Sequence, residues 1–261
     1  MRRAAHAAAV ACALGACTVN NYNYGQADAR GADGAPPGPD AFVPEDPSCG
    51  HPLPTNAPAT ITLKGNVGAV ANGTFGPAAG AIVDLVRIGE TVPVASASAD
   101  TSGNFTIVAQ TGGRPIDGYL RAHSGTGRDN YAYPIAPYAT DASNIPLVIV
   151  DQAFYDELAA AGGATQDPAK AFFLAQAVDC DGKQLIGAMF TIDPSAGASI
   201  AYPRTDGSGN GAATDTSGEA IINNVAPGPL RIDGVQGTTP LHGHRIDARA
   251  NAVTIVWVSP S

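Results

Sequence analysis

A repeated tetrapeptide is the feature that most constrains how this chain can fold. The sequence Asp-Thr-Ser-Gly occurs at residues 100–103 and again at residues 215–218. A short apolar run and a turn rich in Gly or Pro follow each copy, and a Gly-Ala dipeptide opens an earlier apolar run, at residues 80–83 and 187–190. Polar turns between short apolar runs are typical of neighbouring β-strands. We therefore interpret the sequence as two copies of one β-module.

The composition agrees with a chain of many short strands. Of the 261 residues, 31 are Gly and 21 are Pro, and 14% are charged, a mixture that favours strands joined by tight turns over long helices. The formal net charge is −9. Binding to nucleic acid requires a basic surface that neutralises phosphates, so this class of partner is excluded.

The N-terminus has the plan of an export signal, which we assign to residues 1–16. Arg2 and Arg3 supply a positive start, and residues 4–13 form an apolar run too short to span a bilayer. Residues 14–17, Leu-Gly-Ala-Cys, resemble the lipobox of bacterial lipoproteins. That resemblance implies cleavage before Cys17, which would then carry a thioether-linked diacylglycerol and an N-acyl chain.

The resemblance also implies a location in the cell. Thr18 after the cysteine favours the outer membrane, with several acyl chains as a permanent anchor in the lipid. The alternative is ordinary cleavage near Ala16, which leaves a free thiol at Cys17.

Residues 17–58 show no periodic apolar pattern and are rich in Gly, Pro and Asn, so we expect a flexible tether. Once the signal is removed and Cys17 is acylated, two cysteines remain, Cys49 and Cys180. In an oxidising envelope an even pair favours one disulfide, and two separate thiols are the alternative.

Residues 59–150 and 171–261 each predict seven short strands bounded by Gly, Pro, Asn or Asp, the pattern of a Greek-key β-sandwich. Residues 151–170 hold the one good helix and a connector. Asp151 is expected to cap that helix, and Gly162 stands where a C-terminal glycine belongs. The predicted fold class is therefore all-β, with two seven-stranded sandwiches and one short connecting helix, which either plugs one sandwich or packs between the two.

A family resemblance follows from residues 181–188 (Asp-Gly-Lys-Gln-Leu-Ile-Gly-Ala), 214–218 (Thr-Asp-Thr-Ser-Gly) and 224–230 (Asn-Val-Ala-Pro-Gly-Pro-Leu). They resemble carboxypeptidase regulatory-like domains, which are transthyretin-like sandwiches. The first module resembles the same family more loosely. The resemblance implies an accessory module without catalytic residues, because these motifs are mostly turn chemistry and fold does not imply function.

A more distant similarity connects the chain to intradiol dioxygenases, which share the sandwich and bind ferric iron through two histidines and two tyrosines. His242 and His244 stand where the histidine pair would lie, and Tyr202 matches the first tyrosine. Histidines at alternate positions of one strand share a face, so both could reach one metal. The second tyrosine is replaced by Leu230, which implies a degenerate site.

Two further sets of residues each allow a functional and a structural interpretation. Asp206, Ser208 and Asn210 place oxygen donors at alternating positions before a glycine, as in a calcium loop, but position 217 is Ser where a bidentate Glu would complete it. A polar hairpin is the other interpretation. The second group consists of tyrosines that form either an exposed ligand platform or ordinary packing, and we favour packing: Tyr131, Tyr133 and Tyr138.

The sequence as a whole predicts a non-catalytic binding or structural module, anchored to the outer membrane through Cys17. Its partners would be membrane lipid and an envelope protein, peptide or polysaccharide. No cofactor is expected, and iron or calcium enters only through the alternative sites above. The competing hypothesis is a degenerate metal-dependent enzyme related to the dioxygenases.

Overall fold

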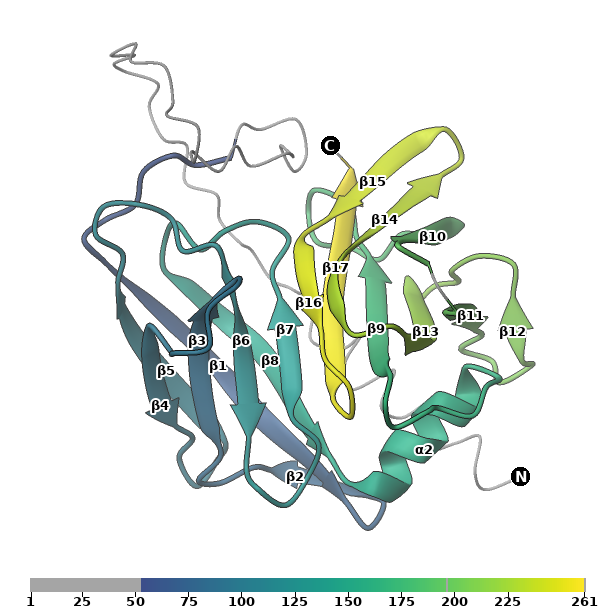
Figure 1. Ribbon diagram of the computed structural model, residues 1–261, viewed down its shortest axis with the longest axis horizontal. Coiled ribbons are helices and arrows are strands. Elements are labelled where there is room, and N and C mark those ends of the chain that lie inside the picture. Colours follow the sequence, from purple (N-terminus) through teal and green to yellow (C-terminus); the bar gives the residue numbers. More distant parts are fainter. Residues whose placement is uncertain (1–52, 196, 261) are drawn as a thin grey trace.

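The computed structural model describes residues 53–195 and 197–260, and in this part of the chain the all-β prediction is confirmed. Figure 1 shows two groups of strands side by side and one helix below them. The signal, most of the tether, Cys17 and Cys49 lie outside the described residues.

One sheet of the first sandwich is built around β1. On one edge β1 pairs antiparallel with β2 and β5, and on the other it pairs parallel with β8. Along β5 the burial of the side chains alternates: inward side chains such as Phe105 are buried, and outward ones are exposed. The strands of this sheet are β1 (Thr60–Ala71), β2 (Thr74–Pro77), β5 (Asn104–Gln110) and β8 (Ala142–Val150).

The facing strands lie in the order β4-β3-β6-β7. Leu85 and Leu120 of this layer meet Leu63 and Phe105 of the other layer in one buried cluster. Burial of such apolar surface is the main force that holds two sheets face to face. The strands of this layer are β3 (Ile82–Arg87), β4 (Ala95–Ser98), β6 (Gly118–His123) and β7 (Asn130–Tyr133).

The second sandwich encloses its own core, in which Phe173, Ile222 and Ile232 are buried. One layer has the order β12-β11-β13-β9-β17, and in the other β14 pairs with β10, β15 and β16. The strands are β9 (Ala171–Ala177), β10 (Ala188–Asp193), β11 (Ser199–Pro203), β12 (Asn210–Gly211), β13 (Glu219–Val225), β14 (Gly228–Gln236), β15 (Thr239–Gly243), β16 (Arg245–Ala248) and β17 (Val253–Pro260).

The repeated tetrapeptide occupies the same place in both sandwiches. It forms the turn before β5 in the first and before β13 in the second, and these strands pair antiparallel with β1 and β9. Asp100 accepts hydrogen bonds from the backbone of Ser102 and Asn104, both at 2.8 Å, and Asp215 accepts one from Ser217 at 3.0 Å. These aspartates therefore act as turn formers, as their position before a glycine predicts.

The two sandwiches share one sheet. β7 of the first pairs parallel with β17 of the second, from Asn130 opposite Val253 to Tyr133 opposite Val256. Because β17 also pairs with β9, the strands run without a break from β4 to β12. Figure 1 shows β7 and β17 where the two groups of strands meet.

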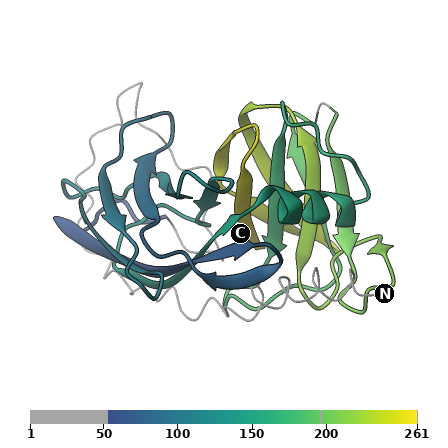
Figure 2. The same ribbon diagram turned by 90° about the horizontal axis from the view of Figure 1, so that it is seen from below.

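Helix α2 (Gln152–Ala161) contacts both sandwiches, which confirms one of the two expected placements. Phe154 packs in a cluster with Val148 from the first sandwich and Ile221 from the second. Figure 2 shows the helix from below, in front of the second group of strands. No helix within residues 53–195 and 197–260 is long and apolar enough to cross a bilayer.

The caps of α2 are those that the sequence predicts. Asp151 caps the first turn, accepting a hydrogen bond from Phe154 N at 2.8 Å. Gly162 is the C-cap, and Gly163 follows it at the C′ position in a left-handed conformation, with φ of +74°. A left-handed glycine at C′ is a common end of an α-helix.

Two details of the strands differ from the expected seven per sandwich. Short hairpin strands, β2 and β12, extend the edges. The single strand expected to carry both His242 and His244 is divided into two strands, β15 and β16, with His244 between them. The break follows Gly243, where a Cβ atom would lie 2.2 Å from Ile232 O, so only glycine fits this close approach.

Candidate functional site

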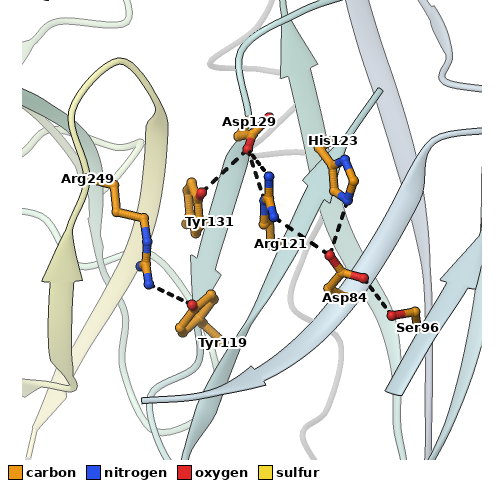
Figure 3. A network of polar contacts seen from close by, with 8 residues as sticks. All are labelled: Asp84, Ser96, Tyr119, Arg121, His123, Asp129, Tyr131 and Arg249. Atoms are coloured by element: carbon orange, nitrogen blue, oxygen red, sulfur yellow. Dashed lines mark hydrogen bonds and ion pairs between the residues drawn. The ribbon is translucent and has the colours of Figure 1, made fainter. Parts of the chain in front are cut away.

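The densest group of polar and aromatic side chains lies where the first sandwich meets the second. Strands β3, β6 and β7 turn alternate residues outward from the first core, toward β16 and the loop before β17. Figure 3 shows this junction, with the ion-paired side chains of the first sandwich beside Tyr119, Tyr131 and, from a loop of the second sandwich, Arg249. We take it as the candidate site because both sandwiches contribute to the contacts of its polar groups.

Arg249 of the second sandwich is held by three tyrosines of the first. Its Cζ atom lies 4.8 Å from the ring centroids of both Tyr119 and Tyr131. Its guanidinium donates hydrogen bonds to Tyr119 OH at 2.7 Å and to Tyr133 OH at 3.3 Å. The rings of Tyr119 and Tyr133 also contact each other, with centroids 4.9 Å apart. Cation–π contacts and charge-assisted hydrogen bonds therefore join the two sandwiches.

The backbone of Asp247 completes this clamp. Tyr133 is fully buried, yet its hydroxyl accepts a hydrogen bond from Asp247 N at 3.2 Å and donates one to Asp247 O at 3.3 Å. Burial raises the pKa of Tyr133 and of Tyr119. Burial disfavours the Arg249 cation, but the tyrosine oxygens outweigh it and raise the pKa of Arg249. The tyrosines stay protonated and the arginine stays charged at neutral pH, which keeps the contact intact.

A second network continues along the outer face of β6. Arg121 donates two hydrogen bonds to Asp129 Oδ2, at 2.9 and 2.7 Å, and its Nη1 lies 4.0 Å from Asp84 Oδ2. Asp84 is buried and accepts a hydrogen bond from Ser96 at 2.6 Å, while His123 Nε2 lies 3.1 Å from its other oxygen. Burial alone would disfavour the Arg121 cation, but the hydrogen bonds to Asp129 raise its pKa. The buried charge is therefore matched by neighbouring charges.

The junction pairs its own charges. Arg121 lies against the carboxylates of both Asp129 and Asp84, and the hydroxyls of Tyr119 and Tyr133 are engaged by Arg249 and the backbone of Asp247. The contacts of Arg249 and Asp247 cross from one sandwich to the other and resist their separation, because parting them leaves buried polar atoms without partners. The arrangement therefore suits a mechanical joint.

Part of this junction was predictable from the sequence. The expected packing of the tyrosine cluster is confirmed, since Tyr131, Tyr133 and Tyr138 are all buried. Arg249, Arg121 and Asp84 were not predicted, because they come from three separate places in the chain. The available signal was the alternation of Tyr131 and Tyr133, which turns both rings to the same face of a strand.

The three residues predicted to hold iron have different partners. Tyr202 OH accepts a hydrogen bond from Phe190 N at 2.8 Å inside the second core, and His242 Nδ1 lies 2.9 Å from Arg231 Nη2. His244 Nε2 lies 2.7 Å from Asp117 Oδ1, in a contact with ion-pair distance but not hydrogen-bond geometry. Within the described ranges no three His, Cys, Asp or Glu side chains are grouped to hold a metal. Iron at this site stays a prediction that requires these side chains to change partners.

The predicted calcium ligands lie on the exposed hairpin between β11 and β12. Asp206 Oδ1 accepts a hydrogen bond from Ser208 N at 2.8 Å, and Asn210 pairs with Pro203. Hydrogen bonds from the side chain and backbone of Ser208 lower the pKa of Asp206. The hairpin is thus closed by its own polar groups, and calcium binding by Asp206, Ser208 and Asn210 stays a prediction.

Of the residues in the cysteine predictions, the structure describes Cys180 but not Cys17 or Cys49. Cys180 takes part in a disulfide. Its predicted partner, Cys49, and the predicted lipidation site, Cys17, lie outside the described residues. The pairing of Cys49 with Cys180 therefore stays a prediction.

A row of three side chains crosses the second sandwich near its repeat turn. Glu219 of β13, Gln176 of β9 and Trp257 of β17 are neighbours in register. Trp257 donates to Gln176 Oε1 at 2.9 Å, and Gln176 donates to Ser217 O at 3.3 Å. Burial, and to a smaller extent the Asp215 carboxylate, raises the pKa of Glu219 to about 8.

Replacing Glu219 by Gln is expected to remove a pH dependence of stability. The folded pKa of about 8 exceeds the ordinary value of 4.5. The folded state therefore binds the proton more tightly, and stability is full below pH 4.5 and falls as the pH rises toward 8. At pH 9 the variant should be more stable than the wild type by about 1 kcal/mol, a value reduced for the partial exposure of the carboxyl group.

Urea denaturation of Glu219→Gln and wild type at pH 5 and pH 9 measures this difference. The same substitution at the exposed Glu157 of α2 is the control and should have no such effect. An equal free-energy difference between Glu219→Gln and wild type at both pH values would contradict the raised pKa.

Comparison with known proteins gives distant likenesses only. No protein-family model and no curated protein matches this sequence. Similar solved structures include the shaft pilin spaA from Lactobacillus rhamnosus GG, at 13% identity over 77% of this chain and 98% of the pilin, with a TM-score of 0.23. The minor pilin GBS52 of Streptococcus agalactiae is 11% identical over 77% of this chain and 96% of its own, with a TM-score of 0.25. Scores this low carry no argument about function.

Proposed function

We propose that this protein is a non-catalytic structural or binding module of the bacterial cell envelope, held at the outer membrane by an acylated Cys17. The observation that carries the proposal is the junction between the sandwiches. Parallel pairing of β7 with β17, the Arg249 clamp and helix α2 all connect the same two bodies. Three independent connections favour one rigid unit over two domains that move about a hinge.

The use of the acidic residues supports a structural role. Asp100, Asp179 and Asp215 each accept backbone hydrogen bonds within their own turns. Asp84 and Asp129 are engaged by Ser96, His123 and Arg121 at the junction, and a carboxylate occupied in this way is less available as a general base. The partner of such a module would be an envelope protein, a peptide or a polysaccharide, bound by its loops or sheet edges.

The anchor is supported by residues 14–17 and the apolar run before them. Replacing Cys17 by Ala is expected to abolish incorporation of radioactive palmitate and to remove the protein from the outer-membrane fraction. Cys12→Ala is the matched control, because Cys12 is expected to leave with the signal and the variant should behave as the wild type. Labelling and density-gradient fractionation of the three chains measure both effects. If Cys17→Ala remained in the outer membrane, the lipid anchor would be wrong.

A further inference from the structure

Strand β5 forms an edge of the first sandwich, and its register shows which backbone groups face outward. Thr111 N donates to Ala59 O at 3.0 Å, and Val67 N donates to Gly103 O at 2.7 Å. In the register of β1 and β5 these contacts make the odd-numbered residues of β5 the hydrogen-bonded partners of β1. The even-numbered residues therefore direct their N–H and C=O groups away from β1.

Three consecutive even-numbered residues leave this edge open: Thr106, Val108 and Gln110. Asn104, the fourth, is closed by its own turn, since its N–H donates to Asp100 and its carbonyl accepts from Asp100 N. Among the described residues no backbone group pairs with the outward groups of the other three. We call Thr106, Val108 and Gln110 the β5 edge.

Two other edges of the protein, those of β10 and β11, are closed by its own groups. On β10, Phe190 N donates to Tyr202 OH at 2.8 Å, and Ala188 N donates to Thr214 Oγ1 at 2.9 Å. On β11 the short strand β12 pairs with Tyr202 and Pro203. Natural sheets block exposed edges with charges, prolines, bulges or cover, because an open edge is a template for another strand. Within residues 53–195 and 197–260, the β5 edge has none of these.

The side chains of the β5 edge fit a second copy of the same strand. All three are exposed, Val108 by 59%, and all three are uncharged in a protein with a net charge of −9. The edge is also symmetric about Val108. In an antiparallel pair of two such edges, Val108 faces Val108 and Thr106 faces Gln110, so neither like charges nor unmatched polar groups are brought together.

We propose that the β5 edge is a self-association surface, through which two copies of this chain pair antiparallel about a twofold axis at Val108. Each of the three residue pairs exchanges two backbone hydrogen bonds, and the two four-stranded sheets become one. An edge contact of this kind buries a small area, so the dimer is weak in dilute solution. Confinement of both copies to one membrane surface would raise their effective concentration.

A cysteine at the centre of the pair tests the geometry. Residues in a hydrogen-bonded antiparallel pair have Cα atoms about 5.5 Å apart, within the range of roughly 4.4–6.8 Å that a disulfide spans. Mild oxidation of the full chain carrying Val108→Cys is expected to give a covalent dimer. Val92→Cys is the control, because Val92 is even more exposed, by 72%, but lies in the loop between β3 and β4. Neither this variant nor the wild type should give a covalent dimer.

A lysine at the same place tests the energetics. Because of the twofold axis, Val108→Lys places two like charges opposite each other, and it should raise the dimer dissociation constant by about tenfold in sedimentation equilibrium. Val92→Lys should leave the constant unchanged. A wild-type chain that stays monomeric at the highest soluble concentration would overturn the proposal. So would equal cross-linking of Val108→Cys and Val92→Cys, or pairing of the edge with an extended peptide in preference to a second copy.

Discussion

Replacing Gly103 by Ala is expected to destabilise the protein by about 3 kcal/mol. Gly103 ends the first copy of the repeated turn with φ of +81°, a left-handed conformation that costs an L-residue roughly 1–2 kcal/mol. A Cβ atom there would also lie 2.5 Å from Val67 O. The two chains cannot part easily to relieve this clash, because Val67 N donates to Gly103 O at 2.7 Å.

A control for this prediction exists within the same repeat. Gly80 has φ of +76° but open space around its Cβ position, so Gly80→Ala carries only the conformational cost, about 1 kcal/mol. The second sandwich repeats the comparison, with Gly218 near Ala177 O, at 2.7 Å, and Gly187 in open space. Thermal and urea denaturation of the four variants measure the differences. Equal losses for Gly103→Ala and Gly80→Ala would show that the close approach to β1 has no energetic effect.

Replacing Arg249 by Ala is expected to destabilise the protein by about 3 kcal/mol. The variant loses two cation–π contacts and the hydrogen bonds to Tyr119 and Tyr133. It also leaves the hydroxyl of the buried Tyr119 without its donor. Since these contacts cross between the sandwiches, the variant weakens the contact between the two sandwiches and leaves the core of each one intact.

Two further variants separate this joint from a general effect of charge. Arg245→Ala removes an exposed arginine of β16 and should cost less than about 0.5 kcal/mol. Arg249→Lys keeps the charge but not the planar, forked group that reaches both hydroxyls, so its loss should lie between the other two. Calorimetry of the full chain measures all three. If Arg249→Ala lost no more stability than Arg245→Ala, the junction would not hold the two sandwiches together as described.

The parts of the fold that the sequence predicted are those with local signals. The turns at residues 100–103 and 215–218, the alternation along β5 and the Asp151 cap all depend on residues within a few positions of one another. The last strand carries a local signal too, because a run of β-branched and aromatic residues favours the middle of a sheet, and β17 pairs on both sides.

The predictions that failed depended on contacts between distant residues. The single strand expected to carry both His242 and His244 was wrong because Gly243 approaches Ile232 O of β14, which alternation along one strand does not reveal. His242 consequently lies in β15 and His244 in the break after it, and they face different partners, Arg231 and Asp117.

The sequence by itself thus determined the β class, the repeated turns, the helix with its N-cap and the polar chemistry that closes each turn. Only the tertiary structure decided the joint between the sandwiches and the open edge of β5. Asn130 and Val253, which face each other in the joint, are separated by 123 positions. Parallel strands are joined by long connections and not by a tight turn, so no short motif announces which two strands will pair. The repeated tetrapeptide fixes how each sandwich turns, and the burial of Tyr133 against Arg249 fixes how the two are held together.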